Sequence, residues 1–64
     1  MAIIKIQNYY INMDRIVYYY FDQGNDNTVI ICADGYVSVN GDYTKPITDE
    51  FKKIYGSKLI QIGD

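Results

Sequence analysis

The sequence predicts an α+β fold in a single β-rich domain, residues 1–64, in which a small antiparallel β-sheet of four to five strands carries one C-terminal helix packed on one face. Three observations support this prediction. Residues 16–21 form an unbroken run of β-branched and aromatic side chains, which favour a pleated strand over a helix. An Asp34-Gly35 pair separates two further strand-like runs. Residues 47–55 repeat apolar side chains at helical spacing.

The first strand is predicted over residues 2–7, where an apolar side alternates with a partly polar side, as is typical of an edge strand. Residues 8–14 contain two asparagines and an aspartate and are expected to turn the chain. The long strand 15–22 follows. Both of its faces are apolar, with Ile16, Tyr18 and Tyr20 on one and Val17, Tyr19 and Phe21 on the other. A single helix can cover only one of these faces.

The loop after this strand decides which tyrosines enter the core. With five loop residues, Tyr18 and Tyr20 lie under the helix, and the outer face carries Val17, Tyr19, Phe21, Val29, Ile31 and Tyr36. With four loop residues, the two sets from the long strand exchange places. Both alternatives leave an aromatic patch on the uncovered face, which is typical of a binding surface or a subunit interface.

The next two strands, 28–33 and 36–40, are joined by Asp34-Gly35, which predicts a two-residue type I′ hairpin. In this register Ala33 faces Tyr36 and Ile30 faces Val39. One face of the hairpin is then wholly apolar and is assigned to the core, with Ile30, Cys32, Val37 and Val39. The other face is mixed, with Val29, Ile31, Ala33, Tyr36, Ser38 and Asn40.

The helix is predicted to begin at Pro46, whose missing N–H costs least in a first turn, and to end at Gly56. Its apolar stripe consists of Ile47, Phe51, Ile54 and Tyr55. Residues 58–62 have strand character, and we expect them to pair with an edge of this sheet or of a second copy.

Little in the composition favours catalysis. The chain has no histidine, and its one cysteine, Cys32, is expected to be a buried, inert thiol. The acidic loop around Asp22 and Asp26 lacks the spacing of a calcium-binding loop. Asp14 and Arg15 are expected to form a local ion pair at the surface. We therefore expect no catalytic residue, no cofactor and no metal site, and we expect that the protein is not an enzyme.

The net charge of −2 and six scattered Lys and Arg residues argue against duplex nucleic acid as a partner. No segment approaches the ~18–20 apolar residues that cross a membrane, so no membrane partner is expected. A single free cysteine is compatible with a reducing compartment, which favours a cytoplasmic location.

Residues 10–16 read Tyr-Ile-Asn-Met-Asp-Arg-Ile and precede a hairpin with Asp34-Gly35 and a closing helix. This arrangement resembles short bacterial and phage proteins of no assigned function, which open with an aromatic residue followed by Ile-Asn-x-Asp-Arg and Ile or Val. The order of strands and helix is also distantly similar to small flagellar-operon proteins of the FlbD type. The resemblance covers residues 9–55 and implies a β-rich fold without catalytic residues. The high tyrosine content departs from this pattern.

Eight tyrosines are the remaining feature, and tyrosine is enriched in interfaces. The candidate interface residues are Val17, Tyr19, Phe21, Val29, Ile31, Tyr36 and Tyr43. The expected function is that of a non-enzymatic homo-oligomer that acts by binding, as a small regulator or inhibitor of another protein. Its size and acidity suit a phage-encoded anti-defence protein. The alternative is a small-ligand protein, an oligomer that binds or sequesters a nucleotide in tyrosine-lined sites.

Overall fold

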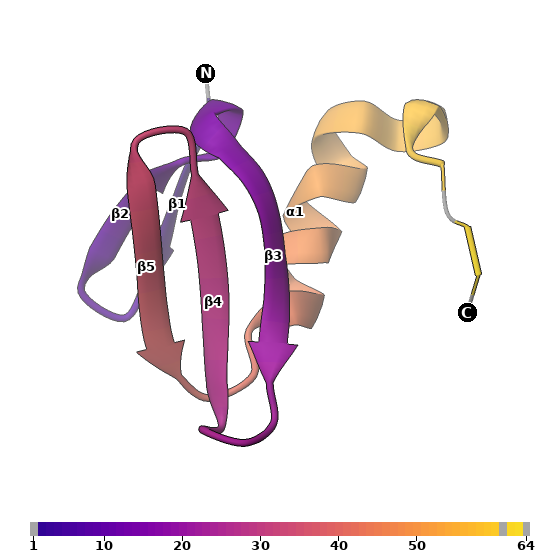
Figure 1. Cartoon of the computed structure of the whole chain (residues 1–64). Helices are drawn as coiled ribbons and strands as arrows, with labels where there is room; N and C mark the ends of the chain where they lie inside the picture. Colours follow the sequence, from indigo (N-terminus) through magenta and orange to yellow (C-terminus); the bar gives the residue numbers. More distant parts are fainter. Residues whose placement is uncertain (1, 61, 64) are drawn as a thin grey trace.

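The computed structural model describes residues 2–60, 62 and 63, and these form five strands, one α-helix and two short 3₁₀ turns (Figure 1). The elements are β1 (Ile3–Ile6), β2 (Tyr9–Asn12), a 3₁₀ turn (Met13–Arg15), β3 (Ile16–Asp22), β4 (Asn27–Cys32), β5 (Gly35–Asn40), α1 (Thr44–Tyr55) and a second 3₁₀ turn (Gly56–Lys58). None of the described helices is long and apolar enough to cross a membrane. The number of strands and the single C-terminal helix agree with the prediction.

The strands form two antiparallel sheets, in contrast to the single sheet predicted. One sheet is the hairpin β1-β2, and the other has the order β3-β4-β5. The sequence pattern assigned residues 8–14 to a turn and thereby missed β2. The chain actually reverses at Gln7 and Asn8, and Gln7 adopts a positive φ of 53°. A glutamine in this conformation is uncommon, so the pair carried a weak turn signal.

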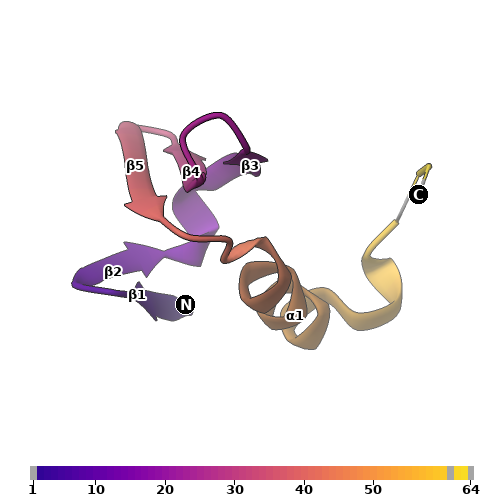
Figure 2. The ribbon, with the colours of Figure 1, turned by 90° about the horizontal axis from the view of Figure 1, so that it is seen from below.

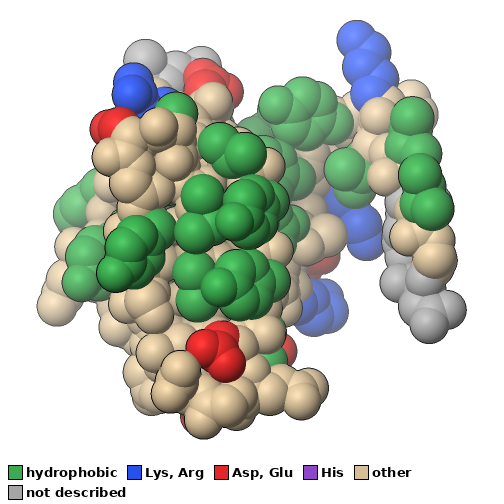
Figure 3. Space-filling model, in the orientation of Figure 1, with side chains coloured by type: hydrophobic (Ala, Val, Ile, Leu, Met, Phe, Trp, Pro, Cys, Tyr) green, Lys and Arg blue, Asp and Glu red, His purple; other side chains and the backbone are tan. Residues whose placement is uncertain are grey.

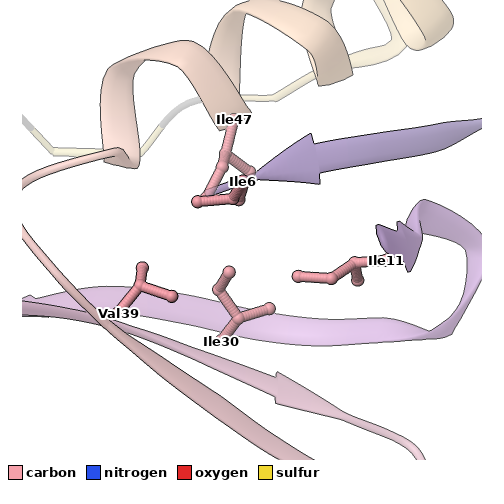
Figure 4. Packing of buried hydrophobic residues seen from close by; sticks show 5 residues of the cluster. All are labelled: Ile6, Ile11, Ile30, Val39 and Ile47. Carbon is pink, nitrogen blue, oxygen red and sulfur yellow. The ribbon is translucent and has the colours of Figure 1, made fainter. Parts of the chain in front are cut away.

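The β1-β2 hairpin and α1 lie on the same side of the three-stranded sheet, which we call its inner face (Figure 2). The core forms where these elements meet, and its buried residues are Ile6, Ile11, Ile30, Val39 and Ile47 (Figure 4). The predicted alternation in the first strand is confirmed, because Ile6 is buried whereas Ile3 is 62% exposed. The opposite face of the three-stranded sheet has no layer of described residues over it.

The β3-β4 hairpin uses the shorter of the two loops considered. Asp22 pairs with Asn27, which leaves the four loop residues 23–26. The inner face therefore receives Tyr19 opposite Ile30, and the other face receives the neighbouring tyrosines. A β-bulge interrupts the pairing between Ile16 and Tyr18.

The β4-β5 hairpin has the predicted faces in a different register. Cys32 pairs with Gly35 and Ile30 with Val37, so the predicted pair Ile30 with Val39 is wrong by two residues. The turn consists of residues 33–34, and neither has the positive φ that a type I′ turn needs. A shift of two residues preserves the face on which each side chain lies, so the assignment of Ile30 and Val39 to the core is confirmed.

The helix α1 begins two residues before Pro46, where the N–H groups of the first turn have no helical acceptor and proline is tolerated. It ends as predicted at Gly56, whose φ of 55° suits glycine. Only the first part of its apolar stripe reaches the core. Ile47 is fully buried, whereas Ile54 and Tyr55 are each 46% exposed.

The predicted strand at residues 58–62 is absent from the described residues, and Gln61 lies outside them. Lys58 belongs to a 3₁₀ turn, and Leu59 and Ile60 have no regular secondary structure. The helix leads the chain away from the sheet, so these residues lie on the far side of α1 from β3 (Figure 1).

Candidate protein interface

The uncovered side of the three-stranded sheet is the candidate site, and we call it the tyrosine face. Because side chains alternate along each strand, β3, β4 and β5 all contribute to it. Alternation assigns Tyr18, Tyr20, Val29, Ile31 and Tyr36 to it, and we include Val17, which lies in the bulge where the alternation is interrupted and is exposed. In space-filling view, hydrophobic side chains gather over these strands (Figure 3).

The register places the tyrosines of this face in cross-strand contact with aliphatic side chains. Tyr18 and Tyr36 both lie opposite Ile31, and Tyr20 lies opposite Val29. The rings of Tyr18 and Tyr20 are nearly parallel, with centroids 6.3 Å apart and an interplanar angle of 18°. The strands thus hold the rings side by side on a flat surface.

This surface is open to solvent. The exposed fractions are 72% for Tyr36, 55% for Tyr18 and 47% for Tyr20, and Val17 is 64% exposed. The three tyrosines expose about 350 Å² if a full tyrosine side chain counts as about 200 Å². This exposed tyrosine area is similar in size to the largest apolar patch on a typical monomer, and such patches are often functional.

Two of the predicted interface residues lie on the other side of the sheet. Tyr19 and Phe21 point to the inner face because the β3-β4 loop has four residues and not five. Tyr19 is half-buried, shares a 2.6 Å hydrogen bond with the Thr48 hydroxyl and stacks on Phe51, with 5.9 Å between ring centroids. Tyr19 therefore attaches α1 to β3.

Tyr43, also among the predicted interface residues, lies at the entrance to α1. It is half-buried and packs against the core, and its hydroxyl accepts a 3.3 Å hydrogen bond from Gln7 Nε2. The structure does bring together the other predicted members, Val17, Val29, Ile31 and Tyr36, and adds the tyrosines of the four-residue alternative.

A cavity of about 280 Å³ lies between β2 and the end of the β4-β5 hairpin. It is lined by Tyr10, Ile11, Asn12, Arg15, Cys32, Asp34 and Val37. Arg15 Nη2 lies 3.5 Å from Asp34 Oδ2, so its partner is Asp34 and not Asp14 as predicted. Cys32 ends β4 and is half-buried, a less enclosed position than the sequence indicated.

The carboxylates lie mainly in turns. Asp22 accepts hydrogen bonds from the Gly24 N–H and the Asn25 amide, which closes the β3-β4 loop. Asp42 accepts hydrogen bonds from the hydroxyl and the N–H of Thr44, and these lower the pKa of Asp42 below its ordinary value of 3.8. Among the described residues, no three His, Cys, Asp or Glu side chains cluster in a way that could hold a metal ion.

No protein-family model matches the sequence, and neither a curated protein nor a solved structure matches it significantly.

Proposed function

We propose that this protein is a non-enzymatic homo-oligomer that acts by binding, as a small regulator or inhibitor of another protein, and that its subunits meet through the tyrosine face. The observation that carries the proposal is the placement of both covering layers, β1-β2 and α1, on the inner face. Large apolar side chains of the tyrosine face are exposed to water. Their burial against a partner would be favourable, because burying apolar surface contributes about 25 cal/mol per Å².

A second copy is the occupant that fits this face best. The side chains that form it are those of tyrosine, valine and isoleucine, with no acidic or basic residue among them, so two copies can approach without repulsion between like charges. Most small oligomers are two-fold symmetric, and such symmetry pairs a surface with itself. Tyrosine supplies a large, rigid contact area together with a hydroxyl that tolerates a partly wet interface. We place this assembly in the cytoplasm, on the basis of the single free cysteine.

The test compares two neighbouring tyrosines on opposite faces of β3. We expect Tyr20→Ser to raise the dissociation constant of the assembly at least about tenfold, because it removes a central aromatic contact. Far-UV circular dichroism should remain native. The matched change Tyr19→Ser should instead lower the melting temperature, because it removes the stacking and the hydrogen bond that fix α1. Light scattering gives the mass of each variant.

The proposal fails if the unmodified protein is oligomeric and both Tyr18→Ser and Tyr20→Ser leave the dissociation constant unchanged. That result would place the interface on another surface. A variant that dissociates while its circular dichroism remains native would support the tyrosine face directly.

The cavity favours a second candidate function, the binding of a small ligand of the nucleotide class. Its lining includes the apolar Ile11 and Val37, and the guanidinium of Arg15, which now pairs with Asp34, could instead pair with a phosphate. Addition of adenosine or guanosine monophosphate should then raise the melting temperature, and Arg15→Gln should abolish the rise. An unchanged melting temperature with nucleotides present at millimolar concentration would exclude this function.

A further inference from the structure

The chain after the second 3₁₀ turn carries a second exposed apolar surface. We call the described residues Leu59, Ile60, Ile62 and Gly63 the C-terminal arm. The exposed fractions are 81% for Ile60 and 91% for Ile62, higher than those of the tyrosines on the sheet. The backbone of Leu59 is extended, with φ −74° and ψ 119°. The arm thus begins in an extended conformation, and Ile60 and Ile62 are β-branched residues of the kind that favour strands.

The outer edge of β3 is the least protected strand edge in the structure. β3 pairs only with β4 among the described residues, and between its bulge near Ile16 and the terminal Asp22 it has no proline, glycine or charged residue. The other outer strands use the usual protections: β1 and β2 have four residues each, β1 carries Lys5, and β5 begins with Gly35 and carries polar Ser38 and Asn40. The helix α1 lies in the layer below the sheet (Figure 2) and contacts β3 through the inner-face side chain of Tyr19, and no described strand pairs with the outer edge of β3.

The tyrosine face alone is small for a stable interface. The exposed area of the three tyrosines and Val17, summed over two copies, is about 800 Å², whereas a specific interface buries at least about 1,000–1,200 Å². The three apolar side chains of each arm expose about 250 Å² more, if a full Leu or Ile counts as about 120 Å². Burial of both arms would raise the total to about 1,300 Å², which lies in the range of stable complexes.

We infer that the C-terminal arm of one copy pairs as an added strand with the free edge of β3 in a second copy. This inference rests on the proposed homo-oligomer. Alternation along the arm would place Ile60 and Ile62 on the same side of the extended sheet, beside Tyr18 and Tyr20, and Leu59 on the inner side. Pairing occurs between copies because α1 lies between the arm and β3 of the same chain (Figure 1).

The experiment uses a nitroxide label at the end of the arm. The nitroxide is attached to the Gly63→Cys variant, which also carries Cys32→Ser and has natural isotope abundance. This protein is mixed with ¹⁵N-labelled protein that carries no nitroxide. We expect the amides of Tyr18 and Tyr20 to broaden in the mixture, although label and amide are on different chains. The matched control adds Ile60→Pro, which removes an N–H that strand pairing uses. It should abolish the broadening and weaken the assembly at least about tenfold, with native circular dichroism because Ile60 lies outside the core.

Light scattering on the same samples separates the failure of this inference from that of the proposed function. Oligomeric mass without broadening of β3 amides would overturn arm exchange and leave the tyrosine-face oligomer intact. The inference would also be overturned if the β3 amides broaden only when the nitroxide and ¹⁵N are on the same chain, since the arm would then pair within its own subunit. A monomeric mass at every concentration would overturn both.

Discussion

Thr28 connects the sheet to the entrance of the helix through its hydroxyl. The side chain is fully buried in β4, where Oγ1 donates a 2.6 Å hydrogen bond to the Gly41 carbonyl and accepts one of 2.7 Å from the Tyr43 N–H. Both groups belong to the connection between β5 and α1. A buried hydroxyl with both of its partners in place explains how a polar side chain is accommodated in so small a core.

Thr28→Val should therefore lower the free energy of unfolding by about 1–3 kcal/mol, because it preserves the shape of the side chain and leaves the two backbone groups unpaired. Thr28→Ser, which retains the hydroxyl and loses a methyl group, should cost about 1 kcal/mol. Urea unfolding at a fixed protein concentration measures both variants. A valine variant as stable as the unmodified protein would contradict the assigned role.

Asp42 makes stability depend on pH. The Thr44 hydroxyl and N–H lower its pKa below 3.8 in the folded protein, so the unfolded chain takes up the proton first as the pH falls. The stabilisation by Asp42 is thus complete above its ordinary pKa and is lost as the pH drops through the folded pKa. We expect the stability difference between the unmodified protein and Asp42→Asn to be constant near neutrality and to shrink below about pH 4. A constant difference down to about pH 2, measured by urea unfolding, would show that the carboxylate makes no such contribution.

Among the secondary-structure elements, α1 is fixed by an aromatic column as well as by Ile47. Phe51 stacks on Tyr19 of β3, and Tyr55 stacks on Phe51 with 6.0 Å between ring centroids. Burial of these rings decreases toward the C-terminal end of the helix, since Phe51 is half-buried and Tyr55 is 46% exposed. The first two turns of the helix therefore carry most of its packing.

Phe51→Ala should lower the free energy of unfolding by about 2–3 kcal/mol, somewhat less than for a fully buried phenylalanine, because part of the ring is already in water. The adjacent change Tyr55→Ala should cost about 0.5–1 kcal/mol, since only one stacked contact of an exposed ring is lost. Chemical unfolding of the two variants provides the comparison. If both variants lose the same free energy of unfolding, the packing of α1 against the sheet does not decrease toward its C-terminal end.

The elements that the sequence predicted correctly are those with strong local signals. The alternation around Ile30 and Val39 identified the inner face, and the spacing from Ile47 identified the helix. The split into two sheets had no such signal, because the turn at Gln7 and Asn8 uses an uncommon backbone conformation. The strand predicted for residues 58–62 had the right composition but no adjacent sheet edge within its own chain.

The candidate site depended on a single loop residue. The side chains of a strand repeat every two residues, so a loop of four residues in place of five moves Tyr18 and Tyr20 outward and Tyr19 and Phe21 inward. Alternating hydrophobicity cannot resolve this choice when both faces of a strand are equally apolar. The tertiary contacts of Tyr19 with α1 resolve it in the folded chain.

The whole molecule has its apolar core on one side of the main sheet and leaves Tyr18, Tyr20 and Tyr36 exposed on the opposite side. A chain of 64 residues buries only about 60% of its unfolded surface, and without disulfides it often gains stability by oligomerisation. Association through the tyrosine face would remove the exposed aromatic surface and supply that stability.

The most direct test is the mass of the unmodified protein in solution, measured by sedimentation equilibrium from about 1 to about 100 µM, the range in which a stable small-domain dimer should persist. We predict a mass of at least twice the 7.4 kDa of one chain. A folded species with the mass of one chain at every concentration would contradict the proposal that copies associate through the tyrosine face.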